Sequence, residues 1–201
     1  MDAPRILASR RALIGFFLKM GAAYAVWFVL YDLWLLPDGR LDTWLSHVVA
    51  ARTADVLAPF FDGVRVSGRV VRLGASPGII VEDGCNGLSP LSLFVGFVLA
   101  YPGTARRRLL FIPAGLLVVS AVNVLRCAAL LVVQAERPGW FEPAHRYEGL
   151  FLFYVVIFAL WVAWAHLGGA TATPAATPPA TPAVGPATPA EAAVPLRGAA
   201  A

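Results

Sequence analysis

The sequence predicts an all-α integral membrane protein of about four transmembrane helices, capped by a small extracytoplasmic amphipathic helix and a β-hairpin. Hydrophobic residues make up 59% of the 201 residues and charged residues only 14%, whereas a soluble domain carries about 25% charged residues. Apolar stretches of transmembrane length, or close to it, lie at about residues 12–36, 85–101, 109–135 and 148–168. A net charge of +4, without a basic run interleaved with aromatics, predicts no nucleic-acid partner.

The first stretch follows the basic residues Arg5, Arg10 and Arg11. It is longer than the roughly 7–15 apolar residues of a signal peptide, so we expect a retained anchor. The second stretch, about 17 residues long, is at the lower limit for a span. Arg106, Arg107 and Arg108 form a basic loop before the third stretch, and basic short loops favour the cytoplasmic side. We therefore expect a multi-pass protein of the cell (inner) membrane with both termini cytoplasmic.

The long connection 37–84 has two further patterns. Apolar residues recur at helical spacing, which predicts an amphipathic helix in the outer interface: Leu41, Trp44, Leu45, Val48, Val49, Val56, Leu57 and Phe60. The segments 64–66 and 69–73 flank a Ser67-Gly68 turn and predict a hairpin, to which 79–82 can add a strand. We assign residues 1–168 to one membrane-embedded domain. Residues 169–201 are rich in Ala, Thr and Pro and are interpreted as a disordered cytoplasmic tail.

Arg126 lies within an apolar run from Leu109 to Gln134 that carries no other charge. A guanidinium in the membrane costs about 2.5–3.5 kcal/mol on insertion scales, and such charges usually face a protein interior or a wet cavity. The predicted topology brings Arg126 to the same leaflet as Cys85 and His145. A thiolate, a fixed cation and a titratable base are the groups that acyl transfer requires.

The segment around Cys85 is suited to present a reactive thiol. Gly84 and Gly87 permit a sharp turn, and Ser89-Pro90 is typical of a helix start with Ser as N-cap. Alternatives stay open, because a lone Cys is often a small buried hydrophobe. Cys127 is interpreted as a packing residue. The two cysteines form neither a disulfide framework nor a metal-ligand pattern, and no cofactor is predicted.

The identity of the base is also open. His145 can be an interfacial histidine, in which case its neighbour Arg146 is the group that points inward. His47, beside the amphipathic stripe, is a weaker candidate for the same role. His166 falls at the opposite end of the last span and is excluded.

These residues resemble the exosortase/archaeosortase family in three places: Cys85-Asn86-Gly87-Leu88, Asn123-Val124-Leu125-Arg126, and His145-x-x-x-Gly149 at the opening of the following helix. The order and spacing agree over roughly residues 80–165. The resemblance implies a sortase-like membrane cysteine protease or transpeptidase. Such an enzyme cuts the C-terminal sorting signal of exported proteins on the outer side. Its partners are these proteins, with a short motif, a transmembrane helix and a basic cluster, and the membrane lipid.

On this interpretation the Cys85 thiolate forms a thioester, Arg126 stabilises the oxyanion and His145 transfers the proton. Asn123, Asn86 and Arg146 are expected to orient the substrate or the guanidinium. The main alternative is a non-enzymatic membrane scaffold in which Arg126 only pairs with an acid, either Glu82 or Glu148. A small transporter, with an intramembrane charge relay, is a weaker alternative, because the apolar run that contains Arg126 offers no acid to partner it.

Overall fold

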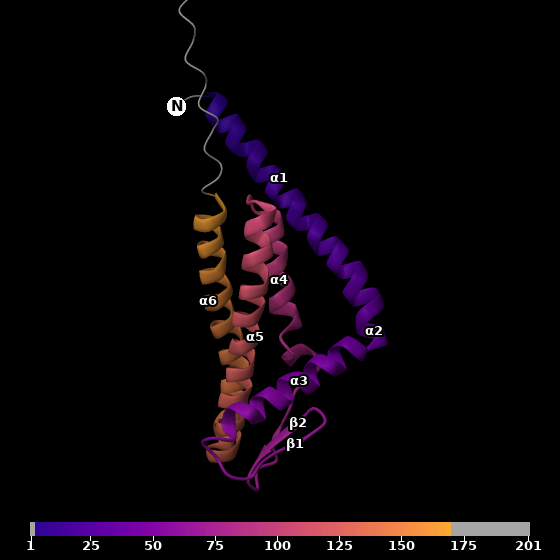
Figure 1. The fold of residues 1–201 in the computed structure, drawn as a ribbon, viewed down its shortest axis with the longest axis vertical. Helices are drawn as coiled ribbons and strands as arrows, with labels where there is room; N and C mark the ends of the chain where they lie inside the picture. Colours follow the sequence, from indigo (N-terminus) through magenta and orange to yellow (C-terminus); the bar gives the residue numbers. More distant parts are fainter. Residues whose placement is uncertain (1–2, 170–201) are drawn as a thin grey trace, which may run out of the picture.

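The computed structural model describes residues 3–169 and is almost entirely helical (Figure 1). The predicted tail, 169–201, lies outside the described residues apart from its first position. The N-terminal helix consists of α1 (Ala3–Trp27), wider π-helical turns η1 (Phe28–Leu35) and a last turn α2 (Leu36–Asp38). The remaining elements, in order, are α3 (Arg40–Leu57), β1 (Val64–Ser67), β2 (Val70–Leu73), β3 (Ile79–Ile80), η2 (Asp83–Cys85), α4 (Leu88–Ala100), α5 (Ala105–Glu136), η3 (Pro138–Trp140) and α6 (Phe141–Gly169).

Three described helices are long and apolar enough to cross a membrane: Arg10–Asp38, Ala105–Glu136 and Pro138–Gly168. They contain three of the four predicted spans. The remaining stretch, 85–101, begins with the turn at Cys85, so its helix α4 has only 13 residues. That length gives about 20 Å of helix, less than the ~30 Å hydrocarbon core. The total of four spans therefore stays a prediction.

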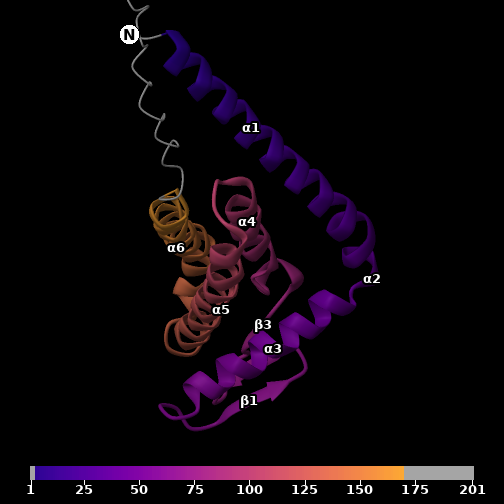
Figure 2. The same ribbon diagram turned by 45° about the horizontal axis from the view of Figure 1, so that its top comes forward.

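The long elements run alternately between two ends of the molecule (Figure 1). The beginning of α1, the connection between α4 and α5, and the end of α6 lie at one end; α3 and the sheet lie at the other. We call the second the sheet end. α5 packs against both α4 and α6. Figure 2 shows α1 running obliquely beside these three helices, with α3 crossing below it. Of the three, α1 packs against α4.

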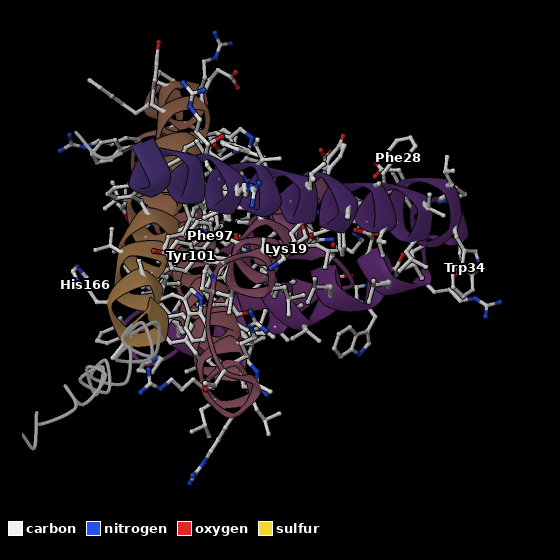
Figure 3. The ribbon with its side chains drawn as sticks, turned by 90° about the horizontal axis from the view of Figure 1, so that it is seen from above. Lys19, Phe28, Trp34, Phe97, Tyr101 and His166 are labelled. Carbon is white, nitrogen blue, oxygen red and sulfur yellow. The ribbon has the colours of Figure 1, made fainter. Side chains whose placement is uncertain are left out.

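Helix α1 is anchored to α4 through aromatic contacts. The Phe16 ring meets the rings of Phe97 and Tyr101 edge to face, at centroid distances of 5.8 and 6.1 Å. The view along the bundle places Phe97 and Tyr101 beneath α1, whereas Phe28 and Trp34 point outward from it (Figure 3). The exposed apolar side chains of α1 suit a lipid-facing surface.

The predicted hairpin is present and extends into a three-stranded antiparallel sheet in the order β1-β2-β3. Val66 pairs with Val71 across the first two strands, and Val71 pairs in turn with Ile79. Gly68 occupies the turn with φ of +61°, a left-handed conformation that glycine adopts without steric cost. Val71 is fully buried, so the sheet covers part of the core instead of standing free.

Helix α3 matches the predicted amphipathic helix, but its protein-facing side differs from the apolar stripe. Trp44 and Phe60, which the stripe includes, are 61% and 78% exposed. The buried side contains mainly small and polar residues: Asp42, Ser46, Val49, Ala50, Thr53 and Leu57. The difference arises because α3 packs closely on α5 and the sheet, where small side chains permit the approach, while larger apolar groups face outward.

A core that we call the sheet-end cluster joins α3, the sheet and α5. Its buried members are Val49, Ala50, Leu57, Val71, Leu73, Ile79, Val81, Cys127, Ala128 and Leu131. Cys127 is 2% exposed, in agreement with the packing role predicted for it. Cys85 and Phe141 are partly buried and pack against the same cluster. This core therefore connects the turn that carries Cys85 to the beginning of α6.

Candidate active site

Cys85 ends a single 3₁₀ turn, η2, between the sheet and α4. The chain is extended at Glu82, with φ −79° and ψ 169°, and the Cys85 amide donates to the Glu82 carbonyl at 2.8 Å. Asn86 and Gly87 complete the turn before α4 begins at Leu88. We call Asp83 to Gly87 the cysteine turn. The Cys85 side chain is half-buried and free of any disulfide.

Gly87 allows this turn and the close approach of α5. Its φ of +87° lies in the region that favours glycine. A Cβ atom at this position would lie only 3.0 Å from Nδ2 of Asn123. That Nδ2 donates a hydrogen bond of 3.0 Å to the Cys85 carbonyl. The glycine thus lets a side chain from α5 hold the backbone of the predicted nucleophile.

The start of α4 differs from the prediction. Gly87, not Ser89, immediately precedes the helix, so the expected Ser89 N-cap is wrong. The side-chain oxygen of Asn86 accepts from the Leu88 amide at 2.9 Å and satisfies one of the free donors of the first turn. An asparagine reaching two residues forward supplies this bond as well as a serine cap would.

Arg126 follows Asn123 by three residues, which places the two side chains on the same face of α5. Its residue exposure is 7%, and its buried Nε has no hydrogen-bond partner. Its Cζ lies 5.9 Å from the centre of the Phe153 ring on α6, near the limit for a cation–π contact. The guanidinium is therefore buried against an aromatic ring without a polar bond at Nε.

The ion pairs among the described side chains do not include Arg126. Glu82, one of the acids that the scaffold alternative requires, is exposed. The side chain of Glu148, the other one, lies outside the description. A buried cation without an ion pair among the described side chains is costly, and it can meet an anionic group of a ligand or transition state.

His145 lies in the first turns of α6 and is half-buried. Its ring stacks on Phe141 with centroids 5.7 Å apart, and its buried Nδ1 has no partner. Arg146 instead has 67% of its side chain exposed and pairs with Glu142 at 3.3 Å. Of these two candidates for the third group, His145 is the one with a buried, uncommitted polar atom.

The three predicted catalytic groups are not joined to one another by hydrogen bonds among the described residues. Phe153, which Arg126 faces, follows His145 by eight residues, or about 12 Å of helix rise. The structure brings Asn123 onto the cysteine turn and Arg126 one helical turn beyond it. His145 lies farther toward the sheet end and shares the sheet-end cluster with Cys85 through Phe141.

The other histidines lie away from this region. His47 is on the exposed side of α3, with its Nε2 near the Gly68 turn of the hairpin. His166 is exposed at the end of α6 opposite the sheet, and its side chain points away from the helices (Figure 3). This position agrees with the exclusion of His166 from the site.

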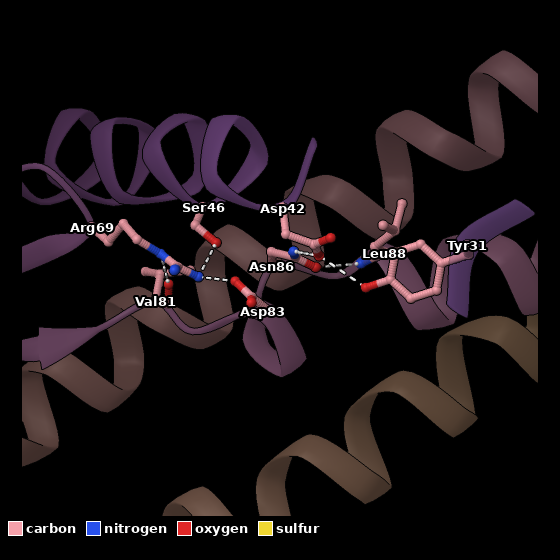
Figure 4. A network of polar contacts seen from close by, with 8 residues as sticks. All are labelled: Tyr31, Asp42, Ser46, Arg69, Val81, Asp83, Asn86 and Leu88. Carbon is pink, nitrogen blue, oxygen red and sulfur yellow. Dashed lines mark hydrogen bonds and ion pairs between the residues drawn. The ribbon is translucent and has the colours of Figure 1, made fainter. Parts of the chain in front are cut away.

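The sequence interpretation missed a polar network on the other side of the cysteine turn (Figure 4). Asp42 on α3 accepts from Asn86 at 2.6 Å and from the Tyr31 hydroxyl at 2.9 Å. Arg69, in the hairpin turn just before β2, pairs with Asp83 and donates to Ser46 at 3.0 Å. A signal existed in the sequence: positions 42, 46, 50 and 53 form a helical face of small and polar residues.

A hollow of about 690 Å³ opens between α3 and α5 beside the cysteine turn, with Asn86 in its wall. Most of its lining is apolar, including Val49, Leu117 and Val124, and Arg52, Asp55 and Ser120 add polar groups. Its size is within the range of about 300–1,000 Å³ found for ligand pockets. An apolar or extended segment of another molecule can therefore reach the vicinity of Asn86 from this side.

The family model described as transmembrane exosortase (Exosortase_EpsH) matches residues 6–162. The chain belongs to the transmembrane exosortase family. The match extends beyond the region of the three motifs to the N-terminal helix, α3 and the sheet. Neither a curated protein nor a solved structure matches the chain.

Family membership and the three apolar helices identify this exosortase as a membrane protein. The family points to a membrane-bound protease or transpeptidase concerned with protein sorting. The matched region contains Cys85, Asn123, Arg126 and His145. Within the residues that the structure describes, no group of three or more His, Cys, Asp and Glu side chains is arranged to hold a metal ion.

Proposed function

We propose that this exosortase is a cysteine protease or transpeptidase that cuts C-terminal sorting signals from exported proteins. One observation carries the proposal most directly. The backbone of Cys85 is held by Asn123, and the buried guanidinium of Arg126 lies one turn farther along the same helix, without an acid among the described residues. A nucleophile whose backbone is held by the helix that carries a buried cation suits acyl transfer through an oxyanion.

In the first step the Cys85 thiolate attacks a substrate carbonyl carbon and forms a C–S bond. The carbonyl oxygen becomes an oxyanion, which the Arg126 guanidinium stabilises in surroundings of low dielectric constant. The C–N bond then breaks, the leaving amine takes a proton, and a thioester remains on Cys85. Water or a second nucleophile resolves the thioester and releases the thiolate.

His145 serves as the proton carrier in this scheme. Its buried, unpartnered Nδ1 can accept a proton from the thiol and return one to the leaving amine. Because His145 has no hydrogen bond to Cys85 in the described structure, the transfer runs through a water molecule or follows closure around the substrate. Catalytic contacts commonly tighten only when substrate is bound.

Asn123 has a second polar atom available, because its buried Oδ1 has no partner. We assign this oxygen to an N–H of the substrate and the Nδ2 to the cysteine turn. Both polar groups of Asn86 already have partners within the chain, so we assign Asn86 to the shape of the turn and of the hollow beside it. Arg146 remains a prediction for orienting the substrate at the start of α6.

We place the site on the outer face of the cell membrane. The loop between α4 and α5 lies at the end opposite the sheet (Figure 1). Arg106, Arg107 and Arg108, which the sequence placed in this loop, follow it directly in the first turn of α5. If that loop is cytoplasmic, as the positive-inside rule favours, the cysteine turn and His145 are directed outward. Exported proteins that present a short motif, a transmembrane helix and a basic cluster then meet the site after translocation.

The experiment uses a co-expressed exported protein that carries such a C-terminal signal, with processing followed by gel mobility. Cys85→Ala should insert normally and abolish processing, because no other group of the proposed site can form the thioester. Cys127→Ala is the matched control and should process normally, since its thiol is a packing group in the sheet-end cluster. Normal processing by Cys85→Ala would refute the proposal and favour a scaffold.

A further inference from the structure

The residues on either side of Cys85 are both tied to one turn of α3 (Figure 4). On the helix side, Nδ2 of Asn86 donates to Oδ1 of Asp42 at 2.6 Å. On the sheet side, Asp83 accepts from Arg69, which also donates to the hydroxyl of Ser46 at 3.0 Å. Asp42 and Ser46 are four positions apart and face the same direction. A single turn of α3 therefore holds both ends of the cysteine turn.

We call the hydrogen bond between Asp42 and Asn86 the Asp42 tether; both of its residues are buried. Asp42 is 0% exposed, and its Oδ1 accepts a second bond from the Tyr31 hydroxyl at 2.9 Å, while Oδ2 has no partner. A buried carboxylate is expensive unless hydrogen bonds offset the loss of water. The bonds that offset it come from Tyr31 at the end of the N-terminal helix and from Asn86 in the cysteine turn. Asp42 thus connects the N-terminal helix and α3 to the site.

Asn86 links the hydrogen bond from Asp42 to the first turn of α4. While Nδ2 of Asn86 donates to Asp42, its Oδ1 accepts from the Leu88 amide at 2.9 Å. The orientation of the Asn86 side chain therefore couples the position of α3 to the first turn of α4. Cys85 lies between Asn86 and Asp83 in the chain, and Asn123 on α5 donates a hydrogen bond to its carbonyl.

The contacts of Arg69 with Asp83 and Ser46, which we call the Arg69 tether, are more exposed to solvent. Arg69 also donates from Nε to the Val81 carbonyl at 3.0 Å, so it links the hairpin turn to α3 and to the chain before η2. The side chains of Arg69 and Asp83 are 29% and 45% exposed. Water and salt screen a pair of this kind, so its contribution is smaller than that of an enclosed bond. The Asp42 tether is therefore the stronger of the two.

We propose that Asp42 is a positioning residue that fixes the cysteine turn through Asn86, with Arg69 as a secondary tether on Asp83. This proposal rests on the proposed function, because it assigns the two residues to the presentation of Cys85. Asp42 acts through Asn86 and has no contact with the reacting atoms in this scheme. Its removal should loosen the cysteine turn and leave the core beneath it intact.

The two cysteines provide the test, because one is in the turn and the other in the core below. In the purified full chain, the rates of alkylation by iodoacetamide are measured separately for Cys85 and Cys127 by peptide mass spectrometry. Asp42→Ala removes the acceptor of two buried donors and should raise the rate at Cys85 about tenfold through local opening. Cys127, 2% exposed, should change by less than about twofold if the opening stays local.

Two variants control for charge and for packing. Asp42→Asn retains Oδ1, which can accept from both Asn86 and Tyr31, and should behave nearly as the parent does. Thr53→Val alters an equally buried polar residue on the same face of α3, whose hydroxyl has no partner, and should leave both cysteine rates unchanged. Processing of the sorting-signal protein should fall in Asp42→Ala alone among these three.

A second pair of variants keeps the test decisive if Asp42→Ala does not accumulate. Asn86→Asp places two carboxylates at the position of a 2.6 Å hydrogen bond and should open the turn. Adding Asp42→Asn restores a donor opposite an acceptor, so the double variant should recover the slow rate at Cys85. Failure of this rescue would overturn the proposal.

The alkylation readout also separates this proposal from the proposed function. An unchanged Cys85 rate in Asp42→Ala would show that no tether exists. Equal rises at both cysteines would assign Asp42 to general packing. If the predicted pattern is found but Cys85→Ala still processes substrate, the tether stands as a structural feature while the assignment of Cys85 as nucleophile, and with it the positioning role, is lost.

Discussion

Replacement of Arg126 by leucine should separate the stability of the protein from its activity. Arg126 is 7% exposed, and no ion pair among the described side chains offsets the cost of burying its charge. That cost is about 2.5–3.5 kcal/mol on insertion scales, whereas a leucine is favourable by about 0.5 kcal/mol. The cation–π contact with Phe153, at 5.9 Å, stabilises the buried arginine by only about 0.5–1 kcal/mol.

Arg126→Leu should therefore insert more favourably than the parent by about 2–3.5 kcal/mol. The activity of Arg126→Leu should fall. Loss of one oxyanion donor typically lowers kcat by about 10²–10³-fold. Arg126→Lys keeps the charge but loses the planar guanidinium fork, so it should recover little of that loss. Phe153→Leu is the control: it removes the ring beneath the guanidinium and should keep most of the activity.

The assay follows two quantities in the same cells: the amount of each variant in the membrane fraction, and the fraction of sorting-signal protein that is processed. We expect normal or raised abundance together with accumulated unprocessed substrate for both Arg126 variants. Degradation of Arg126→Leu together with full activity of Arg126→Lys would refute the reasoning, because it would show that the charge serves a structural ion pair.

Three further predictions concern the base, the turn and the topology. His145→Ala should lose about 10²–10⁴-fold in rate as a proton carrier, while Arg146→Ala should be mild, and the reverse order in a single-turnover assay would exchange their roles. Gly87→Ala should lower processing at unchanged abundance, because it adds about 1–2 kcal/mol of left-handed strain and brings a Cβ 3.0 Å from Nδ2 of Asn123. Gly84→Ala, with no atom within 4 Å of its Cβ, is the control, and equal effects of the two changes would contradict this account. A cysteine introduced at Thr104 should react with an impermeant maleimide only after permeabilisation, and labelling from outside would invert the topology.

The parts of the fold that follow from local pattern were predictable from the sequence. The hairpin at Gly68 and the helix at 40–57 depend on residues that are neighbours in the chain, and both are found. The beginning of α4 was predictable to within two residues, because Ser89-Pro90 is typical of a helix start, although the predicted apolar stretch began earlier, at residue 85. The left-handed backbone at Gly87 sets where that helix begins.

The sequence predicted the site residues that lie within short motifs but not the residues that contact them from distant segments. Asn123, three residues before Arg126, was expected near the site, and its bond to the Cys85 carbonyl supports that placement. The contact of Asp42 with Asn86 spans 44 positions and depends on the way α3 folds back across the bundle. The helical face of positions 42, 46, 50 and 53 sets Asp42 among small and polar residues, but an acidic residue on an amphipathic helix is ordinarily solvated, and that face does not identify Asn86 as its partner. Sequence separation, more than residue type, limited the prediction.

The assignment of Cys85 as nucleophile is tested most directly by capture of its acyl intermediate. The full chain is mixed with a protein that carries a C-terminal sorting signal, quenched in acid, and digested for mass spectrometry. We predict an adduct of the upstream substrate fragment on the peptide that contains Cys85, labile to hydroxylamine as a thioester is, and missing from Cys85→Ala. Cleavage of the substrate at the parental rate by Cys85→Ala, with no adduct at position 85 in the parent, would contradict it.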